Sequence, residues 1–79
     1  MLKIGNIFLM NTQDIGRLIK RRRDSLSLRQ EDLSEMTGVT SKTIYSIENG
    51  KGNPSLDILQ KILNVLGLEI LVQVRKTDE

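Results

Sequence analysis

The sequence feature that most constrains the fold is a stretch in which two short apolar patterns flank one glycine. The apolar residues of this stretch, residues 28–50, are Leu33, Met36, Val39, Ile44 and Ile47. They follow helical spacing on both sides of a break at Gly38, where glycine tolerates the positive φ that a sharp turn requires. Thr40 then offers a hydroxyl that accepts a backbone N–H of the next helix. The pattern predicts a helix-turn-helix.

Length and composition narrow the function. The chain has 79 residues and a net charge of +2, and it contains neither cysteine nor histidine. A domain of this size buries only roughly 60% of its unfolded surface, so a second subunit would stabilise it. Without cysteine the chain can form neither a disulfide nor a thiolate metal site, and without histidine and cysteine it lacks the usual general bases. We expect a cytoplasmic protein that is not an enzyme and needs no metal or cofactor; a carboxylate with a strongly perturbed pKa in a pocket would indicate the enzyme alternative.

The chain divides into an arm at residues 1–10, a helix-turn-helix domain at residues 11–67, a strand at residues 68–75 and a polar tail at residues 76–79. The arm is apolar, but it is too short for a membrane span and lacks a signal-peptide cleavage site. We interpret it as extended or as a strand, and Met10 is an alternative natural start.

The first helix is expected from an N-cap at Asn11 or Thr12 to about residue 25. Its buried stripe consists of Ile15, Leu18, Ile19 and Leu26. Arg22 lies on the same stripe, where its stem would cover apolar surface while its guanidinium reaches water. Gly16 costs about 1 kcal/mol inside a helix relative to alanine, and close packing against another helix would offset this.

Three further helices are expected at residues 30–37, 41–49 and 55–67. Arg29 stands where a serine or threonine cap would be preferred before the second helix, and Ser27 is a partial substitute. Ser55 caps the last helix directly after Pro54, and Gly67 ends it. The segment that follows alternates apolar residues as a strand does, and it must pair with the N-terminal arm or with a second copy of itself.

The basic residues are concentrated in the first helix and the turn after it. They are Arg17, Lys20, Arg21, Arg22, Arg23 and Arg29. Such a concentration is typical of a phosphate-binding surface, although a solvated helix face is the simpler alternative.

The helix at residues 41–49 carries the candidate DNA contacts. Helical winding turns Ile44 and Ile47 inward, and the side chains that project from the opposite side are Lys42, Tyr45, Ser46 and Asn49. Ser41 and Lys42 lie in the first turn, which reaches base edges when a helix enters the major groove. Tyr45 is equally consistent with a phosphate contact or with packing at the rim.

Two other positions complete the predicted site. Gln30 lies in the first turn of its helix, where its amide can donate to a phosphate, although it is equally consistent with an ordinary exposed glutamine. Lys51 and the backbone of its loop can also hold phosphate. Glu48 lies at the edge of the buried stripe and needs a cation, so we expect it to pair with Arg23 and join two helices.

These residues resemble the Xre family, which comprises Cro and phage-repressor helix-turn-helix domains. The resemblance spans residues 15–66 and depends on Ile19, Lys20, Arg23, Gln30, Leu33, Gly38, Val39, Ile44, Ile47, Glu48, Gly50 and Pro54. It implies an all-α, compact bundle of about five short helices that binds operator DNA as a dimer and represses transcription. Arg29 departs from the family's usual cap.

The resemblance also assigns roles to residues. It implies that Ser41, Lys42 and Ser46 read bases, and we add Tyr45 because of its outward position. It implies that Gln30 and Asn49 bind phosphate, and we add Lys51, Asn53 and Arg29. Arg23 and Glu48 correspond to the family's salt bridge. We expect a near-palindromic operator in double-stranded DNA.

A narrower resemblance concerns the order of arm, helical core and single strand, which is similar to that of HipB-like antitoxins. It implies that the strands of two subunits pair across a homodimer, through Leu68, Ile70, Leu71, Val72 and Val74. It also implies a HipA-like serine/threonine kinase toxin as partner. The alternatives are a solitary phage-type or metabolic repressor, and a protein-bridging module that uses the bundle as a cofactor platform.

Overall fold

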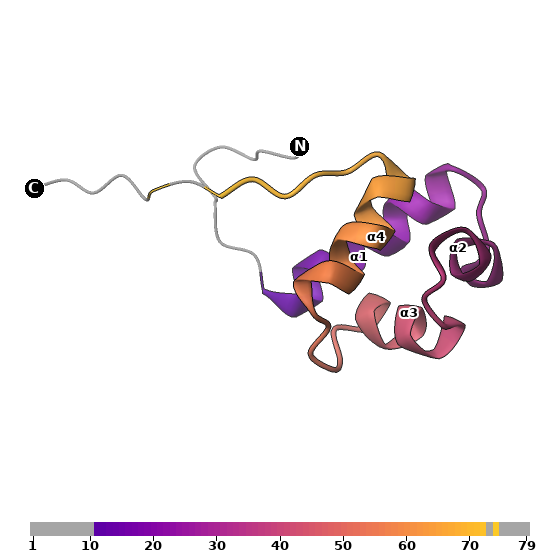
Figure 1. Cartoon of the computed structure of the whole chain (residues 1–79), viewed down its shortest axis with the longest axis horizontal. Coiled ribbons are helices and arrows are strands. Elements are labelled where there is room, and N and C mark those ends of the chain that lie inside the picture. The colour runs from indigo at the N-terminus through magenta and orange to yellow at the C-terminus, as the bar shows by residue number, and fades with distance from the viewer. Residues whose placement is uncertain (1–10, 73, 75–79) are drawn as a thin grey trace, which may run out of the picture.

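The computed structural model describes residues 11–72 and 74, and all regular secondary structure in this part of the chain is α-helix. Its elements are α1 (Thr12–Ser25), α2 (Gln30–Thr37), α3 (Ser41–Glu48) and α4 (Leu56–Leu66) (Figure 1). The predicted bundle is present, with four helices in this part of the chain where about five were expected. None of these helices has the length and apolar character needed to cross a membrane. The predicted arm and the polar tail lie outside the described residues.

The helix starts follow from local hydrogen bonds. Asn11 caps α1: its side-chain oxygen accepts from the backbone N–H of Asp14 at 2.8 Å, and the Asp14 carboxylate accepts from the Asn11 N–H at 3.2 Å. Ser55 caps α4 in the same way, with its hydroxyl accepting from the Ile58 N–H at 3.1 Å. Such reciprocal or single caps satisfy N–H groups that have no partner inside the helix.

The corner between α2 and α3 forms as the sequence predicts. Gly38 adopts φ of 78°, and its N–H donates to the Ser34 carbonyl at 2.8 Å, which closes the end of α2. The Thr40 hydroxyl accepts from the Thr43 N–H at 3.2 Å and starts α3. The helix-turn-helix is therefore built by one left-handed glycine and one threonine cap.

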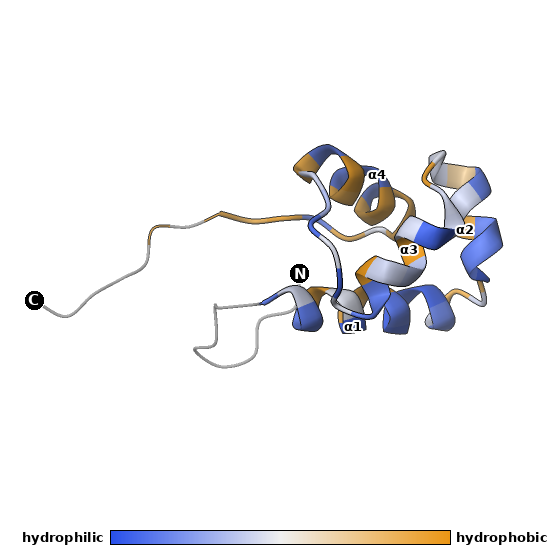
Figure 2. Cartoon of the chain, turned by 90° about the horizontal axis from the view of Figure 1, so that it is seen from below, coloured by the Kyte–Doolittle hydropathy of each residue, from blue (hydrophilic) through white to orange (hydrophobic). Residues whose placement is uncertain are grey.

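The core lies where all four helices meet. Its fully buried side chains are Ile19, Leu33, Ile44, Ile62 and Leu66. Figure 2 shows that α4 is largely hydrophobic, whereas the outer side of α1 is hydrophilic. Two residues that we assigned to apolar stripes are instead exposed: Leu26 by 40% and Met36 by 57%. Leu26 follows the last residue of α1, and an eight-residue helix such as α2 presents too few positions for spacing alone to identify its buried side.

The first and third helices approach each other at Gly16, as the sequence predicts. A Cβ atom at this position would overlap the Ile47 carbonyl oxygen and lie 2.9 Å from the Glu48 carbonyl oxygen. Glycine is thus required for the distance between the α1 and α3 backbones.

The segment after α4 leaves the helices along an extended course (Figure 1). Residues 68–72 and 74 do not form a strand in the single chain. A strand requires hydrogen bonds to a neighbouring strand, and the described part of the chain contains no strand with which this segment could pair. The predicted pairing with a second copy remains a prediction.

Candidate nucleic-acid interface

The outward side of α3 presents the residues that we expected to contact DNA. Lys42, Tyr45 and Asn49 are exposed, and Ser41 and Ser46 are half-buried. Ile44 and Ile47 on the opposite side are buried, which fixes the rotation of the helix about its axis. Tyr45 is 56% exposed, so it is not part of the core. The helix therefore offers an ammonium group, hydroxyls and an amide from one face.

An open groove runs beside this face, between α3 and the loop that leads to α4. It brings together four of the predicted contact residues, which are Lys42, Ser46, Lys51 and Asn53. Thr43 also lines the groove, and the sequence analysis did not single it out. Its hydroxyl lies 3.0 Å from that of Thr40, and its backbone N–H donates to the Thr40 hydroxyl, so Thr43 also takes part in the start of α3. The groove places base-reading and phosphate-binding candidates on one continuous surface.

The asparagine at the end of α3 is partly committed to the helix itself. The Asn49 side-chain amide donates to the Tyr45 carbonyl oxygen at 2.8 Å. This bond caps the last turn of α3 and fixes the orientation of the amide. Because the residue is exposed, its amide group remains accessible beside the groove.

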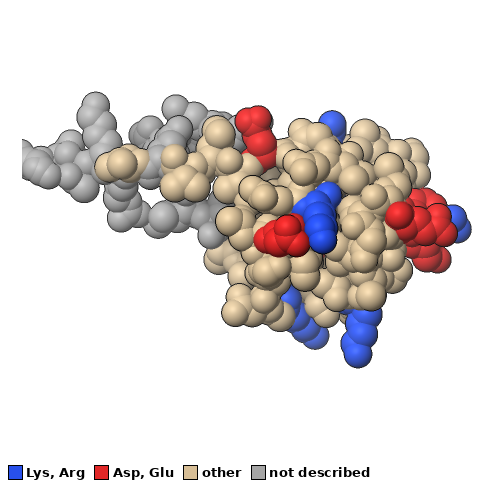
Figure 3. Space-filling view, viewed as in Figure 1, with Lys and Arg blue, Asp and Glu red and all other residues tan. Residues whose placement is uncertain are grey.

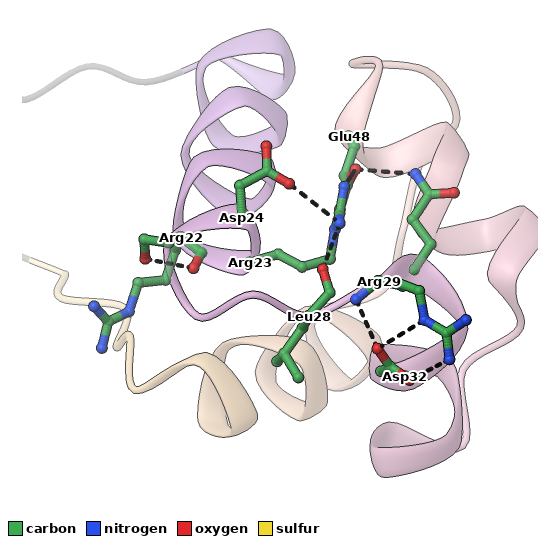
Figure 4. A network of polar contacts seen from close by, with 9 residues as sticks. Arg22, Arg23, Asp24, Leu28, Arg29, Asp32 and Glu48 are labelled. Carbon is green, nitrogen blue, oxygen red and sulfur yellow. Dashed lines mark hydrogen bonds and ion pairs between the residues drawn. The ribbon is translucent and has the colours of Figure 1, made fainter.

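A buried ion pair joins α1 to α3, between the residues that we expected to pair. Arg23 Nε donates to Glu48 Oε2 at 2.6 Å, and Arg23 Nη2 donates to Glu48 Oε1 at 2.9 Å (Figure 4). The Arg23 and Glu48 side chains are only 9% and 1% exposed. This hydrogen bond with Glu48 is the largest cause that raises the pKa of Arg23 above its ordinary value. The paired charges satisfy each other in a region that water does not reach.

The same carboxylate also binds Gln30, the first residue of α2. Gln30 Nε2 donates to Glu48 Oε1 at 3.0 Å. The structure therefore places Gln30 beside the ion pair, half-buried, and not as an isolated surface residue. Arg23 Nη1 also donates to the Leu28 carbonyl oxygen at 2.7 Å, so three helices and a turn meet at this network (Figure 4).

Arg29 directly precedes α2, but its side chain does not cap the helix, and Ser27 does not supply the partial cap that was expected. Ser27 lies in the turn with φ of 58°. Instead, the Asp32 carboxylate accepts from the Arg29 backbone N–H at 2.8 Å and from its guanidinium at 3.1 and 3.2 Å. The side-chain bond from Arg29 is the largest cause that lowers the pKa of Asp32. To contact a DNA phosphate, the Arg29 guanidinium would have to break its hydrogen bonds to Asp32.

Arg22 also differs from its expected role. Its Nε donates to the Leu66 carbonyl oxygen at 2.8 Å, so the guanidinium closes the end of α4. The side chain remains exposed overall. Arg22, one of the basic residues of the first helix, therefore stabilises the fold.

The charges that remain are distributed unequally over the surface. Figure 3 shows basic side chains projecting from the lower edge, where Figure 1 places α3 and the loop after it. Acidic side chains gather over α2, away from that edge (Figure 3). Among the described residues, Lys42 and Lys51 belong to no ion pair, so their ammonium groups are available to phosphates or bases.

Comparison with known proteins identifies the family. Residues 19–72 match the HTH_3 helix-turn-helix model. An HTH-type transcriptional regulator of Methanothermobacter thermautotrophicus is 40% identical over 62 residues, which cover 78% of this chain and 90% of the relative.

Two solved structures share the fold. The restriction-modification controller protein C.AhdI of Aeromonas hydrophila has a TM-score of 0.69 at 26% identity, over 73% of this chain and 88% of its own. A chain of the HipA-HipB-O2-O3 complex has a TM-score of 0.76 at 24% identity, over 89% of this chain and 99% of its own. The chain belongs to the Xre-type helix-turn-helix family and is a DNA-binding transcriptional regulator.

Proposed function

We propose that the chain is a sequence-specific repressor that binds operator DNA as a homodimer. The observation that carries the proposal is the position of Lys42, which is exposed on α3 and lines a groove together with Ser46, Lys51 and Asn53. A short helix with a free ammonium group in its first turn suits the major groove of DNA. This role is one of binding, and it requires neither a catalytic group nor a cofactor.

Within this proposal the contacts divide into two kinds. Lys42 donates to O6 and N7 of a guanine, while Ser41, Tyr45 and Ser46 read neighbouring positions. The phosphate contacts come from Gln30, Asn49, Lys51 and Asn53, with Arg29 contributing only if it releases Asp32. Phosphate contacts set the register on the duplex and make affinity fall as salt rises.

The dimer is proposed from the exposed apolar segment after α4. Ile70 and Leu71 are 41% and 50% exposed, and Val72 and Val74 are 91% and 96% exposed. Such a segment favours aggregation unless it is paired, and an identical segment in a second copy is a suitable partner. A two-fold dimer would bind a near-palindrome whose half-sites are about 34 Å apart.

We further propose that the regulator is the antitoxin of a toxin–antitoxin pair and holds a HipA-like kinase inactive. The support is the fold shared with a chain of the HipA-HipB-O2-O3 complex over 89% of this chain. The alternative is a solitary repressor, with which the match to the Methanothermobacter regulator is equally consistent.

The experiment is selection of bound duplexes from a random pool by the purified chain, followed by footprinting of the enriched sequence. We expect a near-palindromic site with protection on one side of the duplex. Equal affinity for enriched and random DNA at every salt concentration would overturn sequence-specific repression. Co-purification of a kinase from the native host distinguishes the antitoxin from the solitary repressor.

A further inference from the structure

The buried ion pair is connected to the DNA-binding surface through one side-chain amide. Gln30 Nε2 lies 3.0 Å from Glu48 Oε1. An ionised carboxylate can only accept hydrogen bonds, so the NH2 group of Gln30 must face Glu48 and its oxygen must face away. The orientation of the Gln30 amide is therefore set by Glu48.

Glu48 cannot rotate to release this orientation. Both of its oxygens accept from Arg23, at 2.6 and 2.9 Å, and its side chain is 1% exposed. Arg23 is itself held by the Leu28 carbonyl at 2.7 Å. Arg23 also cancels the negative charge of Glu48, which would otherwise repel a phosphate that approached Gln30.

The Gln30 amide carries a second N–H that is not used by Glu48. Gln30 is half-buried at the start of α2, so one side of it remains accessible. We infer that Glu48, with Arg23, is a positioning residue for DNA binding, because it holds Gln30 so that this second N–H is offered to a phosphate. The inference rests on the proposed function and assigns the ion pair a role beyond stability.

The energetic reason is preorganisation. A free glutamine side chain loses rotamer freedom when it binds, and the fixed amide has already lost it in the folded protein. Releasing the amide should weaken DNA binding roughly two- to tenfold, which is the range expected for ordering one such side chain.

The test compares four proteins: wild type, Gln30→Ala, the double variant Arg23→Met/Glu48→Leu, and the combination of all three changes. Replacing both charged partners avoids leaving a buried charge unpaired, and such replacements often preserve stability. Affinity for a mixed-sequence duplex at low salt is measured by fluorescence anisotropy, because a phosphate contact does not depend on base sequence.

We expect Gln30→Ala and the double variant each to lose roughly two- to tenfold in affinity, and the combination to lose no more than Gln30→Ala alone. Adding Lys51→Ala to the double variant is the matched control, because Lys51 is a phosphate contact outside this network, and its loss should add to that of the double variant. Losses that multiply between the double variant and Gln30→Ala, or an unchanged affinity in the double variant, would overturn the inference.

A second measurement needs no variant. The side-chain NH2 resonances of Gln30 in the wild-type protein should shift when the duplex is added, since its free N–H gains a phosphate. Unchanged resonances in a complex that forms would overturn the inference while leaving the proposed function intact. A wild-type protein that binds no duplex would overturn the proposed function itself.

Discussion

Gly16 of α1 lies against the carbonyl oxygen of Ile47 in α3, so closely that a Cβ atom on Gly16 would overlap that oxygen. The neighbouring Glu48 carbonyl oxygen would lie 2.9 Å from this Cβ atom. Both neighbours are backbone atoms of a helix, so they cannot move aside as a flexible side chain would. This contact sets the spacing between the helix that carries Arg23 and the helix that carries Lys42.

The first prediction concerns Gly16→Ala. Alanine would favour an isolated helix by about 1 kcal/mol, but the clash with the α3 backbone opposes this gain. We expect a net destabilisation of about 1–3 kcal/mol, as for other overpacked sites. Urea denaturation followed by circular dichroism measures it, with Gln60→Ala on the exposed side of α4 as control. A Gly16→Ala protein as stable as wild type would contradict the packing.

The second prediction concerns the buried ion pair. Glu48→Ala leaves Arg23 buried without its carboxylate, so we expect a loss of about 3–5 kcal/mol in the free energy of unfolding. Arg23→Met/Glu48→Leu should be much closer to wild type, because no charge is left unpaired. Thermal denaturation compares the two. A double variant that is less stable than Glu48→Ala would show that the unpaired charge of Arg23 is not the cause of the loss.

Both of these features could be predicted from the sequence, whereas a third contact could not. The Gly16 contact was predictable because a glycine inside an apolar helix needs a compensating close approach. The Arg23–Glu48 pair was predictable because a half-buried carboxylate needs a cation and the end of the first helix is rich in arginine. The bond from Gln30 to Glu48 joins residues 18 positions apart, and only the folded arrangement of α2 and α3 brings them within hydrogen-bond distance.

The sequence predicted the start of α2 at residue 30, but the side-chain bond that holds this start was missed for a local reason. The residue before the helix is Arg29, whose side chain has no hydrogen-bond acceptor. The acceptor is Asp32, three residues later, which is the spacing of the second half of a capping box. The C-terminal strand could not be settled from one chain, because its hydrogen-bond partners belong to another segment or another copy.

The third prediction follows from the lowered pKa of Asp32. A depressed folded-state pKa stabilises the protein above the unfolded value of about 3.9, and this contribution is lost as the pH falls through the folded pKa. Asp32→Asn should be less stable than wild type at neutral pH, and the difference should shrink below about pH 4. Arg29→Ala should behave similarly, because it removes the largest cause of the shift. A stability difference between Asp32→Asn and wild type that stayed the same at every pH would contradict the lowered pKa of Asp32.

The fourth prediction concerns the segment after α4. Val72 is 91% exposed in the single chain, so Val72→Lys should leave the helical bundle folded. If two copies pair through this segment, a lysine at its centre places like charges near each other and weakens the dimer. Sedimentation should show a shift toward monomer, and operator affinity should fall with it. Lysine at exposed Gln60 is the control, and a dimer that persists in Val72→Lys would exclude this pairing.

The last prediction separates base reading from phosphate binding on the two sides of the groove. Lys42 and Lys51 both line it and belong to no ion pair among the described residues. They differ in position, since Lys42 lies in the first turn of α3 and Lys51 lies in the loop after it. A lysine in the first turn can reach base edges, whereas a loop lysine follows the phosphate backbone.

Lys42→Ala should therefore cost about 1–3 kcal/mol on the operator and relax the choice of base at one position. Lys51→Ala should weaken operator and random DNA alike and reduce the slope of log affinity against log salt by about 0.9. Anisotropy titrations of both variants on both duplexes, over a range of salt, distinguish these outcomes. If Lys42→Ala lost affinity equally on operator and random DNA, Lys42 would be a phosphate contact, and specificity would have to come from Ser41, Tyr45 or Ser46.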